Sequence, residues 1–229
     1  MQSAASTLAT AGYTRVEGFA QDAVTGLHRE SKSIRGTSWQ AIFNQRLTLD
    51  GSSRRDTKRG REAVYAMLEG ATASTTVGES VYNLPCLVTL GRTVAQWMSD
   101  LLGVPWRLNI AGYIRTRVAG AQHLHRDLPE SSRGGAYTVF VGVHDTGGQP
   151  TVIVPRNASL RCEHISPGDL LCIDSCLPHA GGGCGTGGGR TVAFFSLVPQ
   201  TAPDVSYTRT YPVVWDETRG VPRDLCLEK

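Results

Sequence analysis

The chain reads AYTVFVGVH at residues 136–144 and RTVAFFSLV at residues 190–198, two runs rich in β-branched and aromatic residues. Runs of this composition, bounded by Gly and Pro, predict β-strands. Similar short runs fill the rest of the segment from Trp106 onward, at residues 109–118, 122–127, 150–154, 159–165, 169–174 and 178–180. Short strands with turn residues between them predict a β-sandwich or barrel of the jelly-roll kind.

The chain before Trp106 predicts helices and loops. Residues 62–69 (EAVYAMLE) read as a helix closed by Gly70, and residues 93–102 as a helix closed by Gly103. A short strand is expected at residues 38–49 and a polar loop at residues 72–80. The prediction is therefore a mainly β fold with flanking helices (α+β), in which N-terminal helices buttress a jelly-roll core.

Composition favours one folded domain spanning 1–229. We expect helical or irregular support at 1–105, the β core at 106–200 and a C-terminal extension at 201–229, with strand character at 205–215. Hydrophobic residues at 40% and charged residues at 19% argue against disorder. The formal charge of +3 is too small for a dedicated DNA-binding protein, although it is compatible with an anionic cofactor.

Cysteine usage and the N-terminus bear on the cellular compartment. The six cysteines include no Cys-x-x-Cys pair, which favours reduced thiols. The first residues lack the basic and apolar regions of a secretory signal, and no apolar run is long enough to span a membrane. We expect a cytoplasmic or nuclear protein without membrane contact. The Ser/Ala-rich, acid-poor N-terminus keeps an organelle transit peptide open as an alternative.

A metal site is predicted around the triplet His125-Arg126-Asp127. In an extended segment, alternation places His125 and Asp127 on one face and Arg126 on the other. His179, in the run Leu-Pro-His-Ala-Gly-Gly, would complete a set of two histidines and one carboxylate. Such a set holds non-haem Fe(II) and leaves open positions for chemistry. The alternative is a group of packed polar residues.

Residues 109–198 resemble the double-stranded β-helix of the Fe(II)/2-oxoglutarate-dependent dioxygenases. The family signature is His-x-Asp, a distant His and a basic residue shortly after it. By this resemblance His125, Asp127 and His179 would ligate iron, and Arg190 would pair with the far carboxylate of 2-oxoglutarate. A guanidinium suits that role because it grips a carboxylate through two parallel hydrogen bonds. A surface arginine at the strand end is the alternative for Arg190.

The resemblance implies an oxidoreductase that hydroxylates a C–H bond of an organic substrate and converts 2-oxoglutarate and O2 to succinate and CO2. The implied cofactors are Fe(II) and 2-oxoglutarate, with ascorbate as a candidate accessory reductant. Local runs are similar to the prolyl 4-hydroxylase-like branch, namely Gly147-Gly148-Gln149-Pro150-Thr151, Pro167-Gly168-Asp169 and His179-Ala180-Gly181-Gly182. This similarity points to a peptide, protein or small-molecule substrate. Arg190 stands where that branch usually has lysine, which puts a prolyl substrate in doubt.

Three other functions stay open. The His-Arg-Asp triplet also resembles the TET/JBP oxygenases, which would make a modified nucleobase in nucleic acid the substrate. A cupin-like metal enzyme without an oxoacid would use a similar scaffold but would have no need of Arg190. A jelly-roll binding module would need no metal ligands, and the fold alone does not separate these possibilities.

Further residues are candidates for contacts around the site. Tyr113, Arg115 and Arg117 alternate onto one face of a strand and could bind the cofactor or face solvent. The resemblance adds Thr151 as a cofactor-binding candidate. His123 shares the face of His125, as a group beside the ligands.

Two other segments are candidates for substrate contact at the mouth of the site. One is the glycine-rich loop Gly181–Gly189, which joins His179 to Arg190. The other is a basic cluster, which is either a solvated loop or a contact for phosphates. The cluster consists of Arg54, Arg55, Lys58, Arg59 and Arg61.

Overall fold

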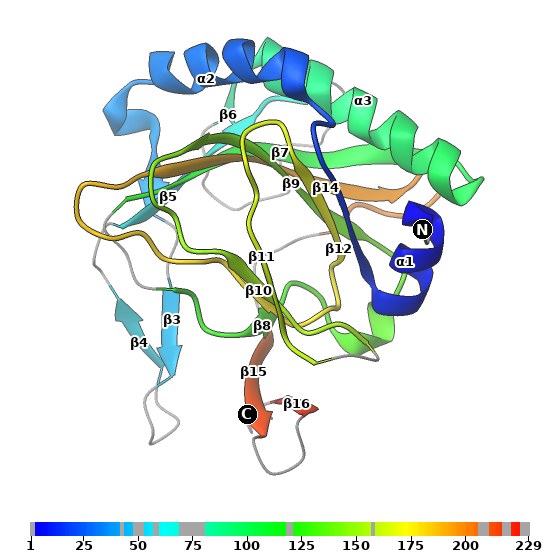
Figure 1. Ribbon diagram of the computed structural model, residues 1–229. Helices are drawn as coiled ribbons and strands as arrows, with labels where there is room; N and C mark the ends of the chain where they lie inside the picture. Colours follow the sequence, from blue (N-terminus) through cyan, green and yellow to red (C-terminus); the bar gives the residue numbers. More distant parts are fainter. Residues whose placement is uncertain are drawn as a thin grey trace.

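The computed structural model describes residues 3–41, 44–47, 53–56, 60–68, 81–117, 121–156, 159–205, 211–216 and 221–224. Two sheets face each other, and helices cover the outer side of the larger sheet (Figure 1). The helices are α1 (Ala4–Ala11), α2 (Val24–Ser33) and α3 (Pro85–Leu102), with short 3-10 turns at Gln21–Ala23, Gly36–Ser38 and Glu130–Ser132.

The larger, major sheet has eight strands. Their order is β1 (Tyr13–Val16), β12 (Leu170–Asp174), β9 (Tyr137–Asp145), β14 (Arg190–Pro199), β7 (Trp106–Thr116), β5 (Arg61–Ala66) and β2 (Gln40–Ala41), with β6 (Val81–Tyr82) beside β5. Neighbouring strands are antiparallel, except that β5 and β6 are parallel.

The minor sheet runs β11 (Arg161–Glu163), β10 (Thr151–Ile153), β13 (His179–Ala180), β8 (His125–Arg126), β15 (Tyr211–Asp216) and β16 (Val221–Asp224). A separate hairpin pairs β3 (Asn44–Leu47) with β4 (Ser53–Asp56).

Alternation along the major strands gives the sheet two apolar faces. The outer face packs against α3, where Ala193 and Phe195 of β14 share a core with Leu87 and Met98. The inner face packs toward the minor sheet through a second core, formed by Ile153, Ile165, Leu171, Ile173 and Leu177. His125 and His179, two of the predicted metal-site residues, lie on strands of the minor sheet, which faces this inner core, and Asp127 directly follows β8.

The eight strands predicted after Trp106 are all present, with shifted ends. The helix predicted at 93–102 is confirmed and begins earlier, because Pro85 occupies its first turn. It ends where predicted, with Gly103 at φ 70° donating its N–H to the Ser99 carbonyl. Among the described helices, none is long and apolar enough to cross a membrane.

The helix predicted at 62–69 is wrong. Residues 61–66 form β5, which pairs with β7 from Arg61↔Thr116 to Tyr65↔Gly112. Val64 joins the outer core while Glu62 pairs with Arg115 across the strands. Sheet pairing on both sides outweighs the helix propensity of the Glu-Ala-Val-Tyr-Ala run.

Other N-terminal predictions fare unevenly. The strand expected at 38–49 corresponds to β2 and β3, and α1 and α2 were not predicted. The C-terminal strand expected at 205–215 is present from Tyr211 as β15. Gly70 and the loop at 72–80 lie outside the described residues.

Candidate metal centre

Two adjacent strands of the minor sheet bring the predicted metal ligands together. His125 begins β8, His179 begins β13, and the two residues are register partners with ring centroids 4.7 Å apart. Asp127 follows β8, and each histidine Nε2 lies 3.7 Å from one of its carboxylate oxygens. The ligand atoms of all three residues lie within 4.8 Å of one another. The three residues predicted to bind metal are therefore grouped at one point.

Backbone contacts fix which ring nitrogen faces that point. His125 Nδ1 lies 2.8 Å from the His123 carbonyl oxygen, and His179 Nδ1 lies 2.9 Å from the Leu177 carbonyl oxygen. Because a carbonyl only accepts, each Nδ1 carries the proton and each Nε2 presents its lone pair to the centre. Metal-ligating histidines are held in this way by hydrogen bonds from the second nitrogen. The donor set thus fits a divalent iron ion.

Hydrogen bonds from a side chain and along the backbone hold the Asp127 carboxylate in place. Thr138 of β9 donates its hydroxyl to Asp127 Oδ2 (2.8 Å), and Thr138 Oγ1 lies 3.0 Å from Ser175 Oγ. The backbone N–H groups of Asp127 and Leu128 both donate to the Ser175 carbonyl at 3.0 Å. These contacts tie the carboxylate to the major sheet.

Burial sets the charge state of His125. Burial, followed by the neighbouring His179, lowers the pKa of His125 to about 4, against an opposing effect of Asp127. The side chains of His125 and His179 are only 12% and 4% exposed. His125 is therefore the neutral imidazole at pH 7, which is the form that ligates a metal.

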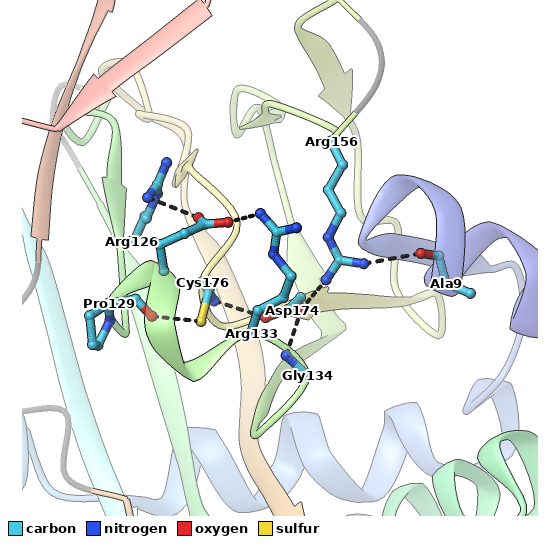
Figure 2. Close-up of polar contacts among 9 residues, drawn as sticks. Ala9, Arg126, Pro129, Arg133, Gly134, Arg156, Asp174 and Cys176 are labelled. Carbon is cyan, nitrogen blue, oxygen red and sulfur yellow. Dashed lines mark hydrogen bonds and ion pairs between the residues drawn. The ribbon is translucent and has the colours of Figure 1, made fainter.

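A salt-bridge network supports the ligand loops from behind (Figure 2). Asp174, fully buried at the end of β12, pairs with Arg156 and accepts hydrogen bonds from the N–H groups of Gly134 (3.1 Å) and Cys176 (3.0 Å). Arg156 also donates to the Ala9 carbonyl of α1. The loop from Asp174 leads directly into His179, so this network fixes the start of β13.

Arg126, whose neighbours in the chain are two of the ligands, points to the same network. It pairs with Glu130 at 2.9 Å, and Glu130 also pairs with Arg133 (Figure 2). The Cys176 thiol donates to the Pro129 carbonyl nearby. The alternation predicted for the His-Arg-Asp triplet is confirmed, because Arg126 faces away from the metal centre.

Arg190 is buried at the first position of β14, with 7% of its surface exposed. Its Nη1 donates to the Gln149 carbonyl at 3.1 Å. Burial lowers its pKa, while Asp145 acts in the opposite direction. The alternative of a surface arginine at this position is therefore wrong.

A second buried arginine accompanies Arg190. Arg61 is 3% exposed, and both arginines are register partners of Thr116, on neighbouring strands of the same sheet. Arg61 donates to Thr116 Oγ1 (3.2 Å) and to the Gly182 carbonyl (2.8 Å). Burial and then the charge of Arg190 lower its pKa to about 10, so both guanidinium groups stay charged at pH 7. Arg61 was expected in the basic cluster, and its pairing in β5 places it in the interior instead.

The predicted cofactor contacts of Tyr113, Arg115 and Arg117 need correction. The Tyr113 hydroxyl donates to Glu30 of α2 at 2.7 Å, and Arg115 pairs with Glu62 at 2.5 Å. These positions lie on the outer face of β7, opposite to Thr116. They are therefore directed away from the metal centre, and Arg117 is exposed.

Thr151 is 3% exposed on β10, on the same strand face as Ile153 of the inner core. Its predicted cofactor contact stays a prediction. His123 is exposed and contributes its carbonyl to the site.

The remaining basic cluster gives no described contact. Lys58 and Arg59 lie outside the described residues, and Arg54 and Arg55 are described only as backbone of β4.

The glycine-rich loop is bound into the fold at its beginning. The Gly181 and Gly182 carbonyls accept from Arg61, and Gly183 donates its N–H to the Gln149 side chain. A Cβ on Gly182 would lie 2.1 Å from the Gln149 carbonyl oxygen, which requires glycine there. The part next to His179 therefore packs against Arg61 and Gln149, beside Arg190, and residues 185–187 are exposed. The expected contact of this loop with substrate stays a prediction.

No protein-family model matches the chain, and no curated protein matches it either. Solved structures do match. An oxidoreductase of the 2OG-Fe(II) oxygenase family from Burkholderia pseudomallei is 13% identical, with a TM-score of 0.61 over 87% of this chain and 91% of its own. A prolyl-4-hydroxylase from Pseudomonas putida is 12% identical, with a TM-score of 0.61 over 87% and 98% of the two chains.

A third similar structure was solved with ligands. HygX from Streptomyces hygroscopicus, with nickel, 2-oxoglutarate and hygromycin B bound, is 14% identical, with a TM-score of 0.58 over 86% of each chain. The chain thus has the double-stranded β-helix fold of the Fe(II)/2-oxoglutarate oxygenases. The sequence prediction of fold class is confirmed.

Proposed function

We propose that the protein is an Fe(II)- and 2-oxoglutarate-dependent oxygenase that hydroxylates a C–H bond of an organic substrate. The observation that carries this proposal is the convergence of His125, Asp127 and His179, with the histidine Nε2 atoms turned to one point. Two histidines and a carboxylate with open positions are typical of non-haem Fe(II) oxygenases. The shared fold supports the same reaction class.

The three ligands would hold iron, and each has its own support. His125 and His179 are oriented by backbone carbonyls, and Asp127 is oriented by Thr138. When bound, iron and 2-oxoglutarate supply the O2 chemistry that oxidises the substrate and releases succinate and CO2. The protein leaves the remaining coordination positions open, since no fourth ligand stands with the three among the described residues.

Arg190 and Arg61 would hold the carboxylate of 2-oxoglutarate that is distant from the metal. Arg190 begins β14 and Arg61 begins β5, so the strand pairing places both residues beside Thr116. In a buried site two cations favour a dianion more strongly than they would in water. The carbonyl groups of Gln149 and Gly182 accept hydrogen bonds from Arg190 and Arg61 and orient the two guanidinium groups.

Formation of succinate tests this function without knowledge of the substrate. The purified protein is incubated with Fe(II), 2-oxoglutarate and O2, and succinate is quantified. We expect slow succinate formation that stops on chelation of iron and in Asp127→Ala. Asp204→Ala, which removes a carboxylate outside the centre, serves as the control and should behave like the wild type. Equal succinate formation in Asp127→Ala and the wild type would contradict the proposal.

The substrate is proposed as a small molecule or a peptide. The similar solved structures include HygX, with hygromycin B bound, and a prolyl-4-hydroxylase, so the fold itself accommodates both kinds. A true substrate should raise the rate of succinate formation above its substrate-free value. Prolyl peptides and polyhydroxylated small molecules are the two sets to compare, and stimulation by one set alone assigns the class.

A further inference from the structure

A cavity of about 270 Å³ lies beside α2, at the ends of β7, β9 and β14. Its wall combines residues of α2 with residues of the outer face of the major sheet, and at the sheet end it also reaches Thr116 and Arg190 of the inner face. His28, Ser31 and Lys32 recur at three and four residue spacing on α2 and so share one helix face. The lining residues are His28, Ser31, Lys32, Ile34, Trp39, Arg115, Thr116, Arg117, His144, Gly189, Arg190 and Thr191.

The cavity has a strongly basic wall. Six of the lining residues are Lys, Arg or His, and none is Asp or Glu among the residues that the structure describes. Two carboxylates act on this wall from outside the lining: Glu62 pairs with Arg115, and Asp145 is the register partner of Arg190 and acts on its charge. Burial and then the charges of Lys32 and His144 lower the pKa of His28, whose ring lies 4.8 Å from that of His144. The environment therefore disfavours an added positive charge.

Two buried nitrogen atoms in this wall lack hydrogen-bond partners within the described part of the chain. They are Nε1 of Trp39 and Nδ1 of His28. The Trp39 ring stacks under Arg115 at 4.1 Å, so its orientation is fixed while its N–H stays unused. A buried polar group without a partner costs stability, and an indole N–H can only donate. A ligand that completes this wall must therefore bring acceptor atoms.

We propose that this cavity binds a small oxyanion, either a phosphate group or a carboxylate group of a metabolite. The basic side chains supply the charge complement, and Trp39 Nε1 supplies a directed donor. The volume is below the usual range for drug-sized ligands, which suits a compact anion. This site goes beyond the proposed function and requires neither iron nor 2-oxoglutarate.

The Trp39 indole N–H gives a direct readout. The chain has four tryptophans, so the metal-free protein labelled with ¹⁵N gives few indole signals, and Trp39→Phe identifies the signal of Trp39. Inorganic phosphate, pyrophosphate and succinate are titrated separately at constant ionic strength, because salt screens such contacts. We expect a saturable shift of the Trp39 signal. A shift with the phosphates alone assigns a phosphate ligand, and a shift with succinate alone assigns a carboxylate ligand.

Calorimetry then measures the affinity of variants of the cavity wall for whichever anion binds. Lys32→Gln should weaken binding about 2- to 5-fold, as expected for an exposed charge. Trp39→Phe keeps an aromatic ring beside Arg115 and should weaken binding about 2- to 10-fold through loss of one hydrogen bond. Arg29→Gln removes an exposed charge from the same helix outside the cavity and is the matched control.

Three results would overturn this site. One is the absence of a saturable Trp39 shift with all three anions. The second is unchanged affinity in both Lys32→Gln and Trp39→Phe. The third is binding that depends on Arg190 and leaves the Trp39 signal unmoved, because the anion would then occupy the proposed 2-oxoglutarate site. Failure of succinate formation in the oxygenase test would leave these measurements unaffected.

Discussion

His125 and His179 face each other across paired strands, with ring centroids 4.7 Å apart, and each uses Nδ1 to contact the carbonyl oxygen two residues before it. The orientation of both rings thus comes from local backbone geometry and from one strand register. A metal would meet ligands that are already turned toward it. Binding of iron should therefore require little rearrangement of the fold.

Each of the three ligands should be required for iron binding. His125→Ala, Asp127→Ala and His179→Ala each remove one of the three donors, so we expect loss of stoichiometric Fe(II) binding in metal analysis. Circular dichroism should show a folded protein, since the triad adds no apolar contacts to the cores. Stoichiometric iron in any of the three variants would contradict the assignment.

Thr138 should influence iron affinity without touching the metal. Thr138→Val removes the hydroxyl that donates to Asp127 Oδ2 and keeps the side-chain volume. Loss of a hydrogen bond that orients a ligand typically weakens metal affinity about 10- to 100-fold. Thr93→Val, at an exposed position of α3, is the matched control. Equal Fe(II) affinity of Thr138→Val and wild type would show that this contact does not orient the carboxylate.

Substitution of Arg190 or Arg61 should weaken the affinity of the protein for 2-oxoglutarate. Arg190→Lys keeps the charge but loses the bidentate pair of hydrogen bonds to the carboxylate, and Arg190→Met loses both the charge and the hydrogen bonds. We expect binding to weaken in that order, with a loss of about 1.5–3 kcal/mol for each charged hydrogen bond removed. Arg61→Met should also weaken binding. Titration of the iron-loaded, oxygen-free protein measures these affinities, and unchanged affinity in Arg190→Met would assign the carboxylate to another cation.

Asp174 should matter for stability, since it is buried and paired with Arg156. Asp174→Ala leaves that guanidinium without its partner and should cost about 3–5 kcal/mol of unfolding free energy. Asp100→Ala on the exposed face of α3 should change stability by less than about 0.5 kcal/mol. Urea denaturation compares the two. A change below 1 kcal/mol in Asp174→Ala, on the order of a surface contact, would contradict the role of this network.

Sequence patterns predicted the strands of the β core and the grouping of His125, Asp127 and His179. The strands after Trp106 were recognised from runs with period-two alternation bounded by Gly and Pro, a pattern that is visible within each short segment. His125 and Asp127 are two residues apart, so an extended backbone alone places them on one face. His179 was expected to complete the set, but its register pairing with His125 was not predicted, because nothing local in the sequence specifies that register.

The errors arose where tertiary pairing decides the structure. Residues 61–66 have helix-forming composition, yet pairing with β7 makes them a strand. That same pairing carries Arg61 into the interior, and no local sequence pattern separates Arg61 from the rest of the basic cluster. Alternation shows that Tyr113 and Arg115 share one face of β7, but it does not identify that face, so the sequence left open whether they contact the cofactor; the structure directs them to Glu30 and Glu62.

The most direct test of the central claim is the visible spectrum of the protein with Fe(II) and 2-oxoglutarate in the absence of O2. Chelation of iron by the oxoacid at a site with open positions gives a weak charge-transfer band, and it needs both components. We predict a band in the wild-type protein that appears only when both are present, and no band in Asp127→Ala. A folded, iron-loaded wild-type protein that binds no 2-oxoglutarate and gives no band would contradict the account.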